Sequence, residues 1–152
     1  MEDEQAVVLE FELKGADFNV AGETSSKIKR ILQQIGVRSD VIRRIAISSY
    51  EAEMNVIIHA HKGKVKAMIY PDRTELLIED EGPGIANIDL AMKEGYSTAP
   101  DYVREMGFGA GMGLPNIARC SDQFDIQSTV EKGTTIKIVI FHDDEKGEKL
   151  SS

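Results

Sequence analysis

Apolar and polar positions alternate along the first patterned segment of the chain, residues 7–13. In the run Leu9-Glu-Phe11-Glu-Leu13 every second side chain is apolar. Because successive side chains of a strand point to opposite faces, this period of two predicts a half-buried strand.

A helical spacing of apolar residues replaces the alternation after Gly22. Gly36 stands where this spacing stops, as is typical of the end of a helix. A second helix is predicted to run to about Ala60, with Ser39 or Asp40 as its N-terminal cap. The apolar face of the first helix is formed by Ile28, Ile31, Leu32 and Ile35.

The rest of the chain predicts strands in hairpin order. Residues 71–74 have turn chemistry, whereas residues 95–106 lack a clear period and are interpreted as a loop. Pro115 is tolerated in the first turn of a helix. The predicted elements are strands 64–70 and 75–80, a short helix 87–93, a helix 114–120, and a final hairpin of strands 124–130 and 134–141.

This order of elements, with helices early and strands mostly in hairpins, predicts an α+β fold. We expect a two-layer α/β sandwich with a mostly antiparallel, mixed sheet and helices on one face. The chain has 152 residues, 41% of them hydrophobic, and shows neither repeats nor a linker. These features predict a single domain over residues 1–152, with a structured core at 7–141 and a charged tail at 142–152.

Charge and cysteine content narrow the possible functions. The formal net charge is -8, so the chain lacks the basic footprint of a nucleic-acid-binding protein. No apolar run approaches the length of a membrane span, and the acidic N-terminus is unlike a signal peptide. The single cysteine, Cys120, cannot form an internal disulfide, which fits a reducing cytoplasm. We therefore expect a cytoplasmic protein with no nucleic-acid or membrane partner.

A narrow polar stripe on the second predicted helix is the first candidate for function. It has apolar residues on both flanks and consists of Arg44, Ser48, Glu51, Asn55 and His59. Such a stripe is either the wall of a cavity or a strip of solvated surface, and on this helix alone the solvated strip is favoured.

Glu51 and Asn55 supply the chemistry of that stripe. They lie one helical turn apart, so their side chains reach a common point. A neutral amide oxygen is a suitable ligand for Mg²⁺. A partly desolvated carboxylate beside it can take a proton from a hydroxyl or a water.

Three glycine-containing segments follow the stripe. Asp80 ends an apolar strand and precedes Gly82 and Gly84. In one interpretation Asp80 accepts a hydrogen bond from the exocyclic amine of a base such as adenine, and the glycines let the backbone pass close to that base. In the other, the segment is a plain turn. Glycines at positions 107, 109, 111 and 113 precede a helix and offer either N–H groups for phosphate or a hinge. Thr134 begins the last strand, as it would in an ordinary hairpin.

In this order the four segments resemble the N box and the three glycine boxes of the GHKL ATPase superfamily. That superfamily has the Bergerat ATP-binding fold and is shared by gyrase, histidine kinases and MutL. The resemblance covers about residues 7–141. The short chain is similar to the bacterial branch of anti-sigma factors and switch serine kinases. Residues 79–85, 94–98 and 109–115 look closest to the stressosome switch kinase.

The resemblance implies a role for each motif residue. Glu51 would be the general base, Asn55 the Mg²⁺ ligand and Asp80 the adenine reader. Residues 91–106 would form an ATP lid, in which Arg104 would reach either the γ-phosphate or a partner. The ATP-binding positions would be Asn55, Asp80, Gly82, Gly84, Ile85, Gly107, Gly109, Ala110, Gly111, Met112, Gly113, Leu114 and Thr134.

The activity implied by the resemblance is that of a serine/threonine protein kinase that uses ATP and Mg²⁺. Its substrate would be a STAS-domain regulator in a partner-switching pathway. One alternative is an anti-sigma factor that sequesters a sigma subunit. Another is a partner-activating module with little turnover, acting on a downstream phosphatase or cyclase. The sequence is compatible with a homodimer and does not specify the cognate partner, the regulated output or the oligomeric state.

Overall fold

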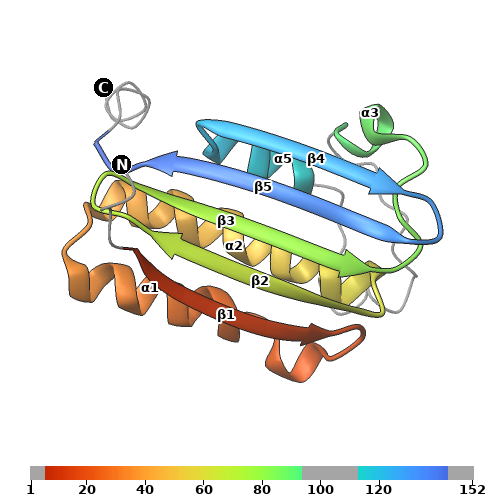
Figure 1. The fold of residues 1–152 in the computed structure, drawn as a ribbon, viewed down its shortest axis with the longest axis horizontal. Helices are drawn as coiled ribbons and strands as arrows, with labels where there is room; N and C mark the ends of the chain where they lie inside the picture. Colours follow the sequence, from red (N-terminus) through yellow and green to blue (C-terminus); the bar gives the residue numbers. More distant parts are fainter. Residues whose placement is uncertain (1–5, 94–112, 144–152) are drawn as a thin grey trace.

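A five-stranded sheet forms one layer of the structure, a computed structural model that describes residues 6–93 and 113–143 (Figure 1). The strands follow the spatial order β1-β2-β3-β5-β4. They are β1 (Val7–Lys14), β2 (Lys62–Ile69), β3 (Arg73–Glu81), β4 (Gln123–Thr129) and β5 (Gly133–Phe141). All four pairings between them are antiparallel, so the described strands do not form the mixed sheet that was predicted. The predicted α+β sandwich is confirmed.

The second layer consists of helices that cover one face of this sheet (Figure 1). They are α1 (Glu23–Ile35), α2 (Ser39–His59) and α5 (Gly113–Cys120), and α2 lies in the middle, in contact with both others. A 3-10 turn, η1 (Phe18–Val20), precedes α1, and a short helix, α3 (Ile88–Ala91), follows β3. Within the described ranges, no helix combines the length and the apolar character needed to cross a membrane.

The hydrophobic core lies between the two layers. Along β3, inward-facing Leu76 and Ile78 are buried and alternate with more exposed neighbours. Ile45 of α2 and Ile117 of α5 are fully buried against the sheet. Each such side chain contributes roughly 1.5–3 kcal/mol through burial, so this packing fixes α2 and α5 relative to β3.

The ends of the helices test the predicted caps. Gly22 and Gly36 flank α1 as predicted, both with φ of 93°. The predicted cap of α2 is wrong, because the helix begins at Ser39 and Arg38 occupies the cap position without a side-chain cap hydrogen bond. The Asp40 carboxylate instead accepts hydrogen bonds from the Arg38 guanidinium at 3.1 and 2.6 Å. This contact lowers the pKa of Asp40.

The later predicted elements are present with small changes at their ends. The short helix predicted at 87–93 spans Ile88–Ala91, and the Asn87 side chain caps it by accepting a hydrogen bond from the Leu90 N–H at 3.0 Å. The helix before β4 and the final hairpin are confirmed. The loop predicted at residues 95–106 lies outside the described residues.

Candidate functional site

The first half of the polar stripe on α2 is buried, and its Arg44 contacts the end of α5. Arg44 is buried, and its guanidinium donates to the Cys120 carbonyl oxygen at 2.9 Å and to Asp122 Oδ2 at 3.1 Å. Ser48 is fully buried. Neither interpretation of the stripe, a cavity wall or solvated surface, is therefore correct for these two residues.

Glu51, Asn55 and His59 form the second half of the stripe, and all three side chains are half-buried. Asn116 of α5 donates from Nδ2 to Glu51 Oε2 at 2.9 Å. The other carboxylate oxygen, Oε1, faces the start of α5, since a Cβ added to Gly113 would lie 3.6 Å from it. The carboxylate therefore lies beside Gly113, the first described residue of α5.

Asp80 and Thr134 meet at the ends of neighbouring strands. The register pairs Glu79 with Thr135, and Asp80 Oδ1 accepts a hydrogen bond from the Thr134 N–H at 3.0 Å. Burial raises the pKa of Asp80, and the Thr134 N–H opposes that rise. Within the described part of the chain Oδ2 has no hydrogen-bond donor, so it can accept one from a ligand.

A small polar network holds the turn after β3 against the hairpin of β4 and β5. Ser128 Oγ accepts a hydrogen bond from the Ile85 N–H at 2.7 Å and lies 2.8 Å from Thr134 Oγ1. Gly84 has φ of 74°, and a Cβ there would lie 2.4 Å from the Thr129 carbonyl oxygen. Only glycine permits this approach. Gly84 and Ile85, which were predicted to bind ATP, thus also support Thr134.

The C-terminal end of α2 connects the two groups of residues. A Cβ added to Gly82 would lie 2.8 Å from Ala60 Cα, so the segment after β3 packs on the residue that follows α2. A Cβ added to Gly63 would lie 2.9 Å from Val56 Cγ1 and 3.2 Å from Asp80 Cβ, so Asp80 lies near Val56, the residue that follows Asn55 on α2. From Glu51 to Val56 the helix rises about 7.5 Å, so Glu51 marks one end of this region and the Asp80–Thr134 pair marks the other.

Other predicted site positions lie outside the described residues. These are Gly107, Gly109, Ala110, Gly111 and Met112, together with the predicted lid beyond Lys93 and its Arg104. Leu114 is described, and its side chain is buried in the core. Its backbone is therefore the part that a ligand can contact.

Three polar residues with structural contacts were not predicted from the sequence. Asn116 contacts Glu51, Ser128 contacts Thr134, and Glu53 is a fully buried carboxylate on α2. Glu53 accepts hydrogen bonds from the backbone N–H groups of Gly22, Thr24 and Ser25 at the start of α1. The sequence signal that could have identified Ser128 is a polar residue at an inward-facing position. Ser128 continues the inward face of β4, after Phe124 and Ile126.

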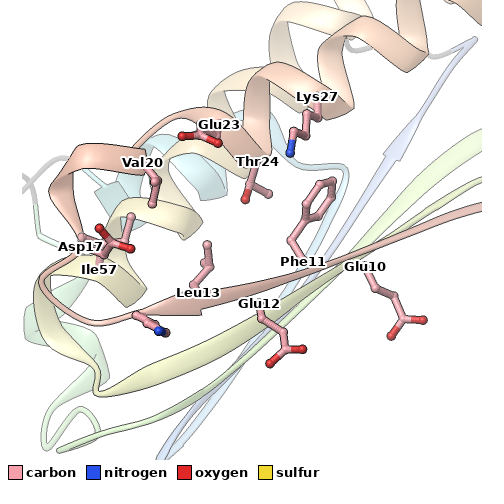
Figure 2. A pocket seen from close by; sticks show the side chains of 11 residues that line it. Glu10, Phe11, Glu12, Leu13, Asp17, Val20, Glu23, Thr24, Lys27 and Ile57 are labelled. Atoms are coloured by element: carbon pink, nitrogen blue, oxygen red, sulfur yellow. The ribbon is translucent and has the colours of Figure 1, made fainter.

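A separate hollow of about 440 Å³ lies between β1 and the start of α1 (Figure 2). Phe11 and Leu13 point from β1 toward α1, and Thr24 and Lys27 lie across from them, whereas Glu12 points to the other side of the strand. Its lining contains none of the motif residues predicted to bind ATP.

The antiparallel sheet covered by three helices on one face places the chain in the class of α+β ATPase sandwiches. The chain belongs to the histidine kinase-like ATPase domain family, whose model matches residues 16–140. This match confirms the resemblance recognised in the sequence motifs. ATP use follows from membership of an ATPase family.

Individual relatives narrow the comparison. The serine/threonine-protein kinase RsbT of Bacillus subtilis (strain 168) is 29% identical over 115 residues, which cover 73% of this chain and 80% of that protein. An anti-sigma F factor of Priestia megaterium is 32% identical over 116 residues, covering 72% of this chain and 76% of that protein. An anti-sigma F factor of Heyndrickxia coagulans is 36% identical over 95 residues, which cover 58% of this chain and 61% of that protein.

Proposed function

We propose that the protein is a Mg-ATP-dependent serine/threonine protein kinase whose substrate is a hydroxyl group on a STAS-domain regulator. The observation that carries the proposal is the half-buried Glu51 carboxylate with Oε1 turned toward the start of α5. A protein that only binds nucleotide needs no base at this position. The similarity to a serine/threonine-protein kinase over most of both chains supports the same activity.

Glu51 acts as the base in this reaction. As the acceptor hydroxyl oxygen bonds to the γ-phosphorus of ATP, the bond from that phosphorus to the β,γ-bridging oxygen breaks and ADP leaves. Glu51 Oε1 takes the hydroxyl proton. Such transfers depend mainly on positioning and on stabilising charge at the phosphate oxygens. The backbone N–H groups at the start of α5, beside Gly113, supply part of that stabilisation.

Asp80 and Thr134 bind the other end of the nucleotide. The Asp80 Oδ2 atom accepts a hydrogen bond from the exocyclic amine of adenine, while Oδ1 stays with the Thr134 N–H. The Ser128 network keeps Thr134 in place. The distance of about 7.5 Å along α2 from Glu51 to Val56, beside which Asp80 lies, leaves room for a ligand whose base and phosphates lie at its two ends.

Asn55 fits the requirement for a metal ligand. Its amide is half-buried, one turn from Glu51, and makes no hydrogen bond to the described residues. A neutral amide oxygen next to a carboxylate is a donor set that Mg²⁺ accepts. When bound, Mg²⁺ would neutralise charge on the phosphates. Asn55 would hold it at the phosphate end of the region, close to the base.

The Glu51→Gln variant tests the assignment. With Mg-ATP and a purified STAS-domain regulator, phosphorylation of serine or threonine, followed by mass spectrometry, should fall about 100-fold or more. ATP affinity, measured by calorimetry, should stay within about twofold. Glu79→Gln, an exposed carboxylate on the outer face of β3, is the matched control and should leave the rate unchanged. Normal phosphorylation by the Glu51 variant would show that the base is another group.

An anti-sigma factor is the second candidate, because relatives with 32% and 36% identity carry that name. In that function the chain binds a sigma subunit, and nucleotide controls the binding. Parallel titrations with a sigma subunit and with a STAS-domain regulator separate the two. Tight sigma binding without phosphorylation of the regulator favours the second candidate. A cytoplasmic location agrees with both, since the single Cys120 thiol suits a reducing compartment.

A further inference from the structure

A chain of three side chains connects α5 to the base. Arg119 donates from Nη2 to Asn116 Oδ1, and Asn116 donates from Nδ2 to Glu51 Oε2 at 2.9 Å. Asn116 and Arg119 lie one turn apart on α5, and Glu51 lies across from them on α2. The contact between Asn116 and Glu51 is half-buried, so water competes with this hydrogen bond less than at an open surface.

The donors and acceptors of this chain specify the orientation of the Asn116 amide. A guanidinium only donates and an ionised carboxylate only accepts. The amide oxygen must therefore face Arg119, and the NH₂ group must face Glu51. A flipped amide would place two donors together at one end and two acceptors together at the other. Asn116 thus holds one carboxylate oxygen of Glu51 in a specified direction.

We propose that Asn116 is a positioning residue for Glu51, which it holds so that Oε1, and not Oε2, serves as the base; this inference rests on the proposed kinase function. The terminal torsion of a glutamate is broad, so an unheld carboxylate samples many orientations. With Oε2 bound to Asn116, Oε1 remains directed at the start of α5, close to Gly113.

The chemistry of an amide suits this task. A lysine or arginine at position 116 would pair with the carboxylate, compete with its proton acceptance and neutralise it. The neutral amide holds one oxygen without cancelling the negative charge, so the other oxygen still accepts a proton. Arg119 acts one residue further away, where its charge orients the amide.

A purely structural role does not account for the contact. The seam between α2 and α5 is already held by the buried Arg44 with its bonds to Cys120 and Asp122. It is also held by the buried side chains of Leu114 and Ile117. Removing the Asn116 amide should therefore change the orientation of Glu51 more than the stability of the fold.

The test uses Asn116→Leu, which keeps the size of the side chain and removes its donor. In the phosphorylation assay we expect kcat to fall about ten- to a hundredfold, because small misplacements of a catalytic group have effects of this size. The KM for ATP should stay within about twofold, and thermal unfolding should show a folded protein. Arg119→Ala should lower kcat, because it removes the donor to the Asn116 amide oxygen. Arg119→Lys keeps a cationic donor and should therefore keep most of the wild-type kcat.

Two controls separate positioning from other effects. Gln127→Leu removes a different amide-to-carboxylate hydrogen bond, from Gln127 Nε2 to Asp125, and should leave kcat unchanged. In a Glu51→Gln background, Asn116→Leu should cause no further loss, because the group that it positions is already gone.

Each remaining outcome decides against a specific claim. If Asn116→Leu has wild-type kcat while Glu51→Gln is slow, Asn116 does not position the base and the proposed function stands. A higher kcat in Asn116→Leu would make the contact a brake, which overturns the inference in the same way. If the losses of kcat from Glu51→Gln and Asn116→Leu add in the double variant, Asn116 does not act through Glu51. Absence of transfer by the wild-type protein would overturn the proposed function, and with it the positioning role.

Discussion

Replacing Glu53 with glutamine perturbs the contact that joins the start of α1 to the middle of α2. Glu53 is fully buried. Its Oε2 accepts hydrogen bonds from the N–H groups of Gly22 at 3.0 Å and Thr24 at 3.3 Å, and its Oε1 accepts one from Ser25 at 3.3 Å. These donors belong to the first turn of a helix and have no intrahelical acceptor. Glu53 therefore caps α1 from a neighbouring helix.

The expected loss follows from the number of acceptors. Glutamine keeps one oxygen, so if that oxygen takes the place of Oε2, its NH₂ group faces the Ser25 N–H. A buried donor left without an acceptor costs about 1–3 kcal/mol. Removing the carboxylate also removes the cost of burying a charge, which offsets part of this loss. We expect Glu53→Gln to lower the free energy of unfolding by about 1–2 kcal/mol near pH 5.

The pH dependence of this difference has a definite sign. Burial raises the pKa of Glu53 above 4.5, even though backbone N–H groups from Ser25, Thr24 and Gly22 oppose the rise. Between 4.5 and the raised value the folded state binds more protons than the unfolded state. Stability contributed by Glu53 is thus present below 4.5 and lost as pH rises through the folded pKa. The advantage of the wild type over Glu53→Gln should shrink between pH 5 and pH 7.

Urea unfolding at the two pH values measures this difference. The matched control is Glu23→Gln, which makes the same change on an exposed residue in the first turn of α1 and should cost less than about 0.5 kcal/mol. A wild-type advantage that grows with pH would refute the argument from burial. Equal stability of wild type and Glu53→Gln at both pH values would refute the capping role.

Two further predictions concern the predicted adenine end of the site. Asp80→Asn should raise the Kd for ATP about tenfold or more, because a charge-assisted acceptor worth about 1.5–3 kcal/mol is replaced, while its amide oxygen still accepts from Thr134. Burial raises the pKa of Asp80, so calorimetry should also show the ATP affinity of the wild type falling as the pH drops through that raised pKa, with no such fall in the variant. An ATP affinity of Asp80→Asn equal to that of the wild type would exclude Asp80 from the site. Gly133→Ala should destabilise the fold by about 3 kcal/mol, because φ is 153° and the new Cβ would lie 2.0 Å from the Asp80 carbonyl oxygen. Gly36→Ala, with φ of 93° and open space, should cost only about 1 kcal/mol in thermal unfolding, and equal losses would refute the close-approach argument.

The elements of the fold were predictable because their signals are local. Alternating residues in 124–130 and 134–141 identify a hairpin without knowledge of the rest of the chain, and β4 and β5 pair as expected. Gly22 and Gly36 mark the ends of α1 for the same reason. The cap of α2 failed because Asp40 had an alternative partner in Arg38, and propensity alone does not rank a guanidinium against a helix terminus.

The contacts of the candidate site were less predictable because they are made between distant segments. Glu51, Asp80 and Thr134 stand in recognisable motifs, so the sequence alone could single them out as candidates. Asn116 contacts Glu51 across 65 positions of sequence, and its role depends on how α5 crosses α2. Glu53 stands between residues of an apolar pattern, and its partners lie about 30 positions earlier, at the start of α1.

The short helix α5 makes the orientation of the base depend on tertiary structure. Eight residues are too few for a stable isolated helix, so α5 keeps its place through packing on α2 and the sheet. At its C-terminal end Arg44 holds the Cys120 carbonyl oxygen, and at its N-terminal end Asn116 holds Glu51. Any displacement of the start of α5 therefore moves Gly113 and Asn116 together. The backbone N–H groups proposed to face phosphate and the oxygen proposed to take the proton are consequently coupled through one helix. Through this coupling Asn116, which is not proposed to touch ATP or the acceptor hydroxyl, would control their reaction.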